Sequence, residues 1–122
     1  MVAKRGQALS VPVEVRVSSG YHVTSAAPGD RYLKPLRLTW EKGALVSGAP
    51  VYPEPTFLDN AETKTKLSVY EGAFTIKQPI TVPSDAPQGF GALVGKLSFQ
   101  ACTDTECYPP ATIPVRLSYD IR

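Results

Sequence analysis

The sequence predicts an all-β protein with an immunoglobulin-like antiparallel two-sheet β-sandwich, on three observations. Apolar and polar residues alternate over long stretches, as they do in strands with one buried and one solvated face. Twelve prolines and nine glycines in 122 residues leave few uninterrupted stretches for a helix. Hydrophobic residues make up 43% of the chain, enough for a packed core. We therefore expect residues 1–122 to form a single domain.

Five segments carry the strand pattern in chain order. Residues 11–17 have valine at every second position, with polar or proline neighbours. Residues 36–40 alternate two leucines and a tryptophan with arginine and threonine, and residues 74–82 alternate phenylalanine, isoleucine and valine with threonine and lysine. Residues 93–101 and 113–121 repeat this period with leucine, phenylalanine, valine and tyrosine. Each segment is predicted to bury one face.

Segments rich in proline, glycine, serine and aspartate separate these strands and predict turns. They are residues 27–30, 47–50, 52–55 and 83–89. Roughly seven to nine strands are expected at this spacing of turn signals. Residues 51–66 contain few aliphatic side chains, so we expect an ordered connection there that crosses from one sheet to the other.

Charge and composition exclude several classes of function. The net charge is only +2 and the basic residues are scattered, so nucleic acid is not expected as a partner. No apolar run approaches the roughly 20 residues needed to cross a bilayer, and we expect this segment to be a monomer that does not span a membrane. Two cysteines and one histidine fall short of the about four ligands of a structural zinc site, so no metal and no cofactor are expected.

The reactive residues of the chain are concentrated at Cys102 and Cys107. The two cysteines flank residues 103–106, between two predicted strands, where a hairpin would let them form a disulfide. The alternation assigns Leu97, Phe99 and Ala101 to the core, which predicts that Cys102 points away from it. A disulfide near the surface that closes a short loop adds only about 2 kcal/mol of stability and is open to exchange with a partner thiolate.

The alternative interpretation is a passive hairpin disulfide in a secreted β-sandwich module that binds a protein or a sugar. Under either interpretation Asp104 and Glu106 lie between the cysteines, and their negative charge is expected to raise the pKa of both thiols. The free thiols would then be poor nucleophiles that depend on a docked partner. His22 is a candidate for proton transfer, although a lone histidine on a strand more often serves packing.

One segment around the cysteines resembles the signature of the N-terminal periplasmic domain of the thiol:disulfide interchange protein DsbD. The segment runs Phe99-Gln100-Ala101-Cys102-Thr103-Asp104-Thr105-Glu106-Cys107-Tyr108-Pro109-Pro110. Residues 20–23 and residues 69–72 resemble further stretches of the same family, and the order and spacing agree over nearly the whole chain. The family fold is an immunoglobulin-like sandwich, which agrees with the fold predicted from the alternation.

The resemblance implies a relay of electrons by a thiol:disulfide oxidoreductase. A thioredoxin-like domain would reduce the Cys102–Cys107 pair, which would then reduce periplasmic disulfide isomerases or the thioredoxin-like proteins of cytochrome c maturation. Cys107 is expected to be the cysteine first linked to a partner. The chain would be the periplasmic redox domain of a larger protein anchored in the inner membrane.

The resemblance also implies a cap loop whose aromatic side chain shields the disulfide until a partner displaces it. The matching residues are Val69, Tyr70 and Glu71. Because Val69 stands at or near the place of a phenylalanine in the family, Tyr70 is the candidate cap. Tyr108 and Pro109 are expected to form a docking surface beside the sulfurs, or alternatively only to shape the turn into the last strand.

Overall fold

The computed structural model describes residues 1–28, 33–60 and 65–122, and these residues form strands and no helix. The all-β prediction is confirmed. The strands are β1 (Val2–Ala3), β2 (Ala8–Arg16), β3 (His22–Thr24), β4 (Arg37–Trp40), β5 (Val46–Ser47), β6 (Thr56–Asn60), β7 (Thr65–Tyr70), β8 (Ala73–Thr81), β9 (Gly89–Phe99), β10 (Ala101–Cys102) and β11 (Ala111–Ile121). Across the described residues, no helix is long and apolar enough to cross a membrane.

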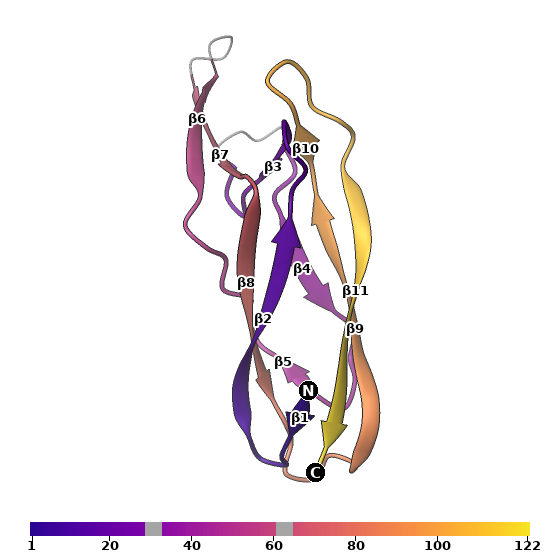
Figure 1. Ribbon diagram of the computed structural model, residues 1–122. Coiled ribbons are helices and arrows are strands. Elements are labelled where there is room, and N and C mark those ends of the chain that lie inside the picture. Colours follow the sequence, from indigo (N-terminus) through magenta and orange to yellow (C-terminus); the bar gives the residue numbers. More distant parts are fainter. Residues whose placement is uncertain (29–32, 61–64) are drawn as a thin grey trace.

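The strands form an elongated sandwich, which confirms the immunoglobulin-like prediction (Figure 1). One sheet has the order β1-β11-β9-β4 and a second has the order β2-β8-β5. A third sheet, β10-β3-β7-β6, lies at one end, where β10 follows β9 and β7 precedes β8. All of the strand pairs are antiparallel except β1 with β11.

Two apolar clusters fill the sandwich. The first cluster consists of Ala3, Leu45, Ile80, Val82, Ala86, Leu93 and Ile121. The second cluster, nearer the third sheet, consists of Val23, Leu36, Leu38, Tyr70, Ile76 and Leu97. Trp40 packs against both. Its ring lies on β9 at Gly95, where a Cβ would come within 2.6 Å of the indole, so only glycine leaves room for it.

Trp40 also makes a polar link between the two main sheets. Its indole Nε1 on β4 donates to Oε1 of Gln78 on β8 at 2.7 Å. Gln78 is fully buried on the core face of β8, and its amide nitrogen donates to the carbonyls of Gly48 and Pro79. Each polar atom of this buried side chain therefore has a partner, as burial requires.

The expected connection over residues 51–66 is wrong in part, because Thr56–Asn60 form β6 and pair with β7. Residues 61–64 of that prediction, and Gly29 and Asp30 of the predicted turn at 27–30, lie outside the described residues. Strand β6 is at the edge of its sheet and its Phe57 is exposed, so the apolar alternation that identifies strands is missing there. The short strands β1, β5 and β10 also raise the number of strands above the predicted range.

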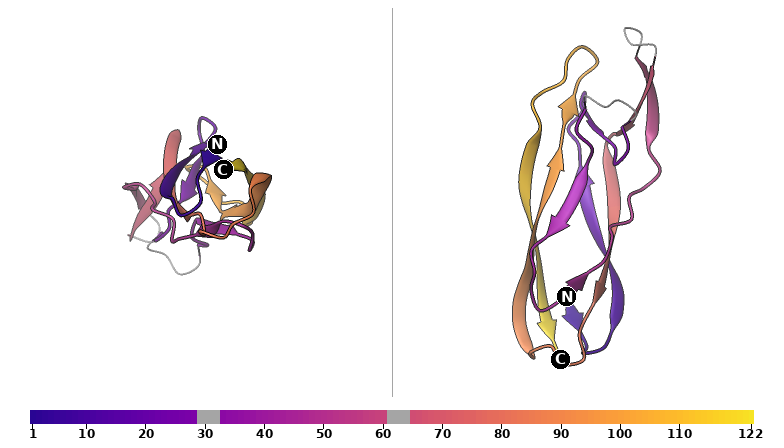
Figure 2. Two further views of the ribbon diagram at one scale, coloured as in Figure 1. Left: turned by 90° about the horizontal axis from the view of Figure 1, so that it is seen from below. Right: turned by 180° about the vertical axis from the view of Figure 1, so that it is seen from behind.

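The cysteine loop and the chain termini lie at opposite ends of the sandwich. The loop between β10 and β11, which contains Cys107, lies at one end, and both termini lie at the other (Figure 1). The view from behind shows the same arrangement (Figure 2). The cysteine pair is therefore far from the points where the chain begins and ends.

Candidate functional site

A disulfide joins Cys102 at the end of β10 to Cys107 in the following loop, with a Cα–Cα distance of 4.0 Å. The intervening residues form a tight turn closed by the hydrogen bond from Thr103 N to Glu106 O, 2.7 Å long. The Thr103 hydroxyl oxygen also accepts the backbone amide of Glu106 at 3.3 Å. A threonine hydroxyl that bonds the backbone ahead of it is typical of turns, so the local sequence itself closes this loop.

The two cysteines differ strongly in exposure. Cys107 is exposed, whereas Cys102 is only 1% exposed. The prediction that Cys102 lies near the surface is therefore wrong. The direction predicted by the alternation is nevertheless right, because Phe99 and Ala101 pack against the second cluster and Cys102 belongs to neither cluster. Cys102 is buried on the opposite face of the third sheet, where β10 pairs with β3.

Gln100 is a residue of this site to which the sequence analysis gave no role. Its side chain is buried, its Oε1 accepts the backbone amide of Lys34 at 2.9 Å, and its Nε2 donates to the Tyr108 carbonyl at 3.1 Å. The backbone amide of Tyr108 also donates to the Ala101 carbonyl at 2.9 Å. Gln100 thus holds the residue that follows Cys107. Its position in the segment that resembles DsbD was the one available signal.

Two exposed tyrosines lie together beside the disulfide loop. The rings of Tyr21 and Tyr108 have centroids 6.1 Å apart, and the Tyr108 hydroxyl donates to Glu106 Oε1 at 3.1 Å. Pro109 is exposed as well. These residues give the surface next to Cys107 an aromatic and apolar character.

The carboxylate of Glu106, which accepts the hydrogen bond of the phenol, raises the pKa of Tyr108. We expect Glu106→Gln to lower that pKa toward its ordinary value of 10.0, because the amide keeps an acceptor but loses the negative charge. The measurement is an alkaline titration of phenolate absorbance, from which the curve of Tyr108→Phe is subtracted. Asp104→Asn changes a carboxylate of the same turn that has no hydrogen bond to Tyr108, so it should leave the Tyr108 titration unchanged. An unchanged pKa of Tyr108 in Glu106→Gln would show that Glu106 is not the cause of the raised pKa.

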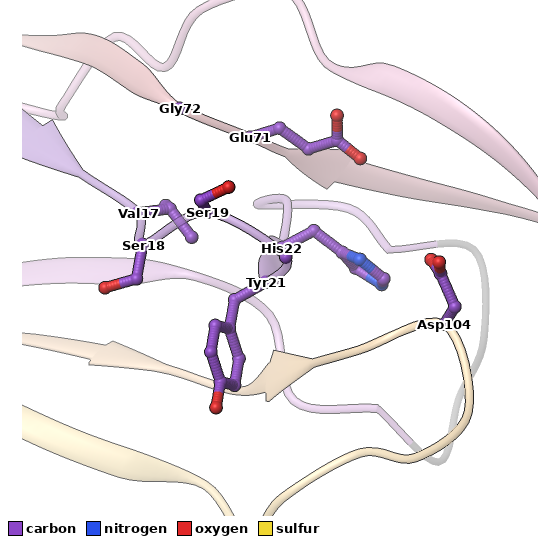
Figure 3. Close-up of a pocket in the computed structure, with 9 residues that line it drawn as sticks. Val17, Ser18, Ser19, Tyr21, His22, Glu71, Gly72 and Asp104 are labelled. Atoms are coloured by element: carbon purple, nitrogen blue, oxygen red, sulfur yellow. The ribbon is translucent and has the colours of Figure 1, made fainter.

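A pocket of about 440 Å³ opens beside the cysteine loop (Figure 3). Residues 17–22, Glu71, Gly72 and Asp104 line it. The imidazole of His22 and the carboxylates of Glu71 and Asp104 point into the same space, whereas the Tyr21 ring points away. The structure therefore brings together His22, Glu71 and Asp104, which the sequence analysis had placed near the site from three separate segments.

Tyr70 is not placed as a cap. In the third sheet Val23 pairs with both Tyr70 and Ala101, so these side chains share one face, and Cys102 lies on the other face. Tyr70 is 5% exposed, its hydroxyl donates to the Pro53 carbonyl at 2.9 Å, and burial raises its pKa. This position contradicts the expectation that Tyr70 covers the disulfide.

The other residues of the expected cap region have different environments. Val69 is buried and pairs with Thr24, so it lies on the same face of the third sheet as His22 and Cys102. Glu71 is exposed and lines the pocket. Within residues 1–28, 33–60 and 65–122, no three His, Cys, Asp or Glu side chains are grouped so as to hold a metal ion.

Comparisons with known proteins agree with this geometry. The family model described as "Thiol:disulfide interchange protein DsbD, N-terminal" matches residues 1–118. A search of the curated proteins finds no match.

Two solved structures share the fold at low sequence identity. The N-terminal domain of DsbD from Neisseria meningitidis, in its reduced form, superposes with a TM-score of 0.59 at 16% identity, over 89% of this chain and 76% of that one. The N-terminal periplasmic domain of ScsB from Proteus mirabilis gives a TM-score of 0.60 at 16% identity, over 97% of this chain and 43% of that one.

Proposed function

Because the chain belongs to the family of N-terminal domains of the thiol:disulfide interchange protein DsbD, we propose that it is a thiol:disulfide oxidoreductase domain. In this proposal the Cys102–Cys107 pair accepts two electrons from a thioredoxin-like domain. It passes them to a periplasmic disulfide isomerase or to a thioredoxin-like protein of cytochrome c maturation. The observation that carries the proposal is a disulfide in a short loop, with one exposed cysteine, at the end of the sandwich opposite both termini.

The exposure difference supports an order of events. A partner thiolate attacks Sγ of the exposed Cys107, the S–S bond breaks, and its electron pair goes to Sγ of the buried Cys102. The second thiol of the partner then attacks the mixed disulfide as a thiolate, which releases the reduced pair and the oxidised partner. Tyr108 and Pro109, exposed next to Cys107, serve in this proposal as the surface on which the partner docks.

The solved relatives support a proposal for the compartment in which this domain works. The ScsB domain is described as periplasmic, and we propose the same compartment for this chain. We further propose that residues 1–122 act as one domain of a larger protein anchored in the inner membrane. Both termini lie at the end of the sandwich opposite the disulfide, so neighbouring segments could attach there without covering Cys107 (Figure 1).

The relay is tested against the alternative of a passive disulfide in a binding module. The protein is equilibrated in glutathione buffers of increasing reducing power, while the thiol content and the circular dichroism are followed together. The reduced domain is then mixed with an oxidised thioredoxin-like acceptor. We expect reversible reduction of a folded domain and transfer of two electrons per domain, with no transfer from a Cys102→Ala/Cys107→Ala control. A pair that is reduced only on unfolding, or that reduces no acceptor, supports the passive disulfide.

A further inference from the structure

The buried position of Cys102 creates a chemical problem for the proposed exchange. When a thiolate attacks Cys107, Cys102 becomes the leaving group and carries the displaced electron pair. At 1% exposure its sulfur has almost no water to solvate a negative charge, and burying an unpaired charge is expensive. The reaction therefore benefits from a proton delivered to Cys102 as the S–S bond breaks.

His22 is the ionisable residue placed to deliver that proton. It is the direct partner of Cys102 in the antiparallel pairing of β3 with β10, so both side chains lie on the same face of the sheet. Residues opposite each other in such a pair have Cβ atoms about 5 Å apart. His22 is itself 6% exposed, and its accessible edge lines the pocket beside the cysteine loop. The imidazole thus lies on the same side of the sheet as the buried sulfur and is in contact with a space that opens to solvent.

The ionisable groups around the imidazole come from three segments. Glu71, after β7, and Asp104, in the cysteine turn, point into the pocket that the ring faces (Figure 3). Tyr21 precedes His22, and its ring points away from the ring of His22. Among the described residues that line the pocket there is no lysine or arginine, so His22 is the one lining residue that can supply a positive charge.

From this geometry we infer that His22 donates a proton to Cys102 during reduction of the disulfide and takes it back when the reduced pair transfers its electrons. The inference rests on the proposed function and adds a residue to its chemistry. In the forward step the attacking thiolate bonds to Cys107 Sγ, the S–S electron pair moves to Cys102 Sγ, and this sulfur takes the imidazolium proton. The neutral imidazole regains a proton from solvent through the pocket. In reverse, the imidazole accepts the Cys102 proton as this sulfur attacks the mixed disulfide at Cys107.

The test is the pH dependence of reduction by excess dithiothreitol, which needs no protein partner. Rates are measured by alkylation of the freed thiols from about pH 5 to about pH 9 and are divided by the thiolate fraction of the reagent. For the wild-type protein we expect this corrected rate to fall about tenfold from the low to the high end of this range, because only a protonated imidazole can donate. For His22→Gln we expect a flat profile at the lower rate. A merely structural histidine would change the rate equally at every pH.

Matched variants of the same pocket identify the titrating group. Ser19→Ala, Glu71→Gln and Asp104→Asn keep His22, and each is expected to keep the fall in rate. The inference is overturned if His22→Gln keeps the fall, or if one of the carboxylate variants abolishes it. Should His22→Gln fail to fold, the wild-type profile decides, because a flat corrected rate excludes the proton donor. Failure of the proposed relay would instead appear as no electron transfer to the protein acceptor, a step that the dithiothreitol assay does not measure.

Discussion

The Cys102→Ser variant is expected to be trapped as a mixed disulfide with a thioredoxin-like partner at least about tenfold faster than the Cys107→Ser variant. In Cys102→Ser the remaining thiol is the exposed one, and a partner disulfide can approach it directly. In Cys107→Ser the remaining thiol is Cys102, which is 1% exposed and belongs to a strand paired with β3. Access to the sulfur is required for exchange, so the two variants should differ although each keeps one cysteine.

The measurement is the rate at which a covalent complex appears on a non-reducing gel after each variant is mixed with an oxidised partner. Alkylation by a small reagent in parallel reports accessibility without docking, and denatured samples of both variants provide the reference for intrinsic reactivity. Equal trapping rates in the folded proteins, or faster trapping through Cys102, would contradict the order of attack and remove the role proposed for the buried sulfur.

Much of the sandwich was predictable because its long strands each bury one face. Strands β2, β8 and β9 show the alternation in the sequence and the same alternation of exposure over most of their length in the structure. In β11 the alternation begins only at Val115, because Ile113, which the pattern assigns to the buried face, is 45% exposed. The third sheet was less predictable. In β3 all of the three residues are buried, and β6 lies at an edge, so neither shows a period of two. Periodicity identifies a strand only where one face is wet and the other is dry.

Alternation along the sequence also falls short at individual residues of the candidate site. The cysteine pair and its acidic turn were identified from the sequence, since they are contiguous. The burial of Cys102 was not, because the alternation gives only the direction of the side chain and not what covers that face. In the structure His22 and Val69, from β3 and β7, lie on the same face as Cys102, and all three are buried. The assignment of Tyr70 as a cap failed for a related reason: its face is set by pairing with Val23, and that pairing places the ring in the core.

Gln78 is a polar residue on the core face of β8, at a position where the alternation predicts an apolar side chain. We expect Gln78→Leu to lower the free energy of unfolding by about 2–4 kcal/mol, although leucine is the more apolar residue. The substitution leaves the Trp40 indole N–H and the Gly48 carbonyl without the partner each has in the structure. The carbonyl of Pro79 is affected less, since it also accepts the Gly48 amide at 2.9 Å.

Urea unfolding with the disulfide kept oxidised measures this loss, and Gln88→Leu provides the matched control. Gln88 is exposed, so the same chemical change there should alter the free energy of unfolding by no more than about 0.5 kcal/mol. In a Trp40→Phe background the indole donor is already absent. Gln78→Leu should then lower the free energy of unfolding by less, because it no longer leaves an indole N–H without a partner. A Gln78→Leu protein as stable as the wild type, or one whose loss is unchanged by Trp40→Phe, would show that this link does not hold the two sheets together.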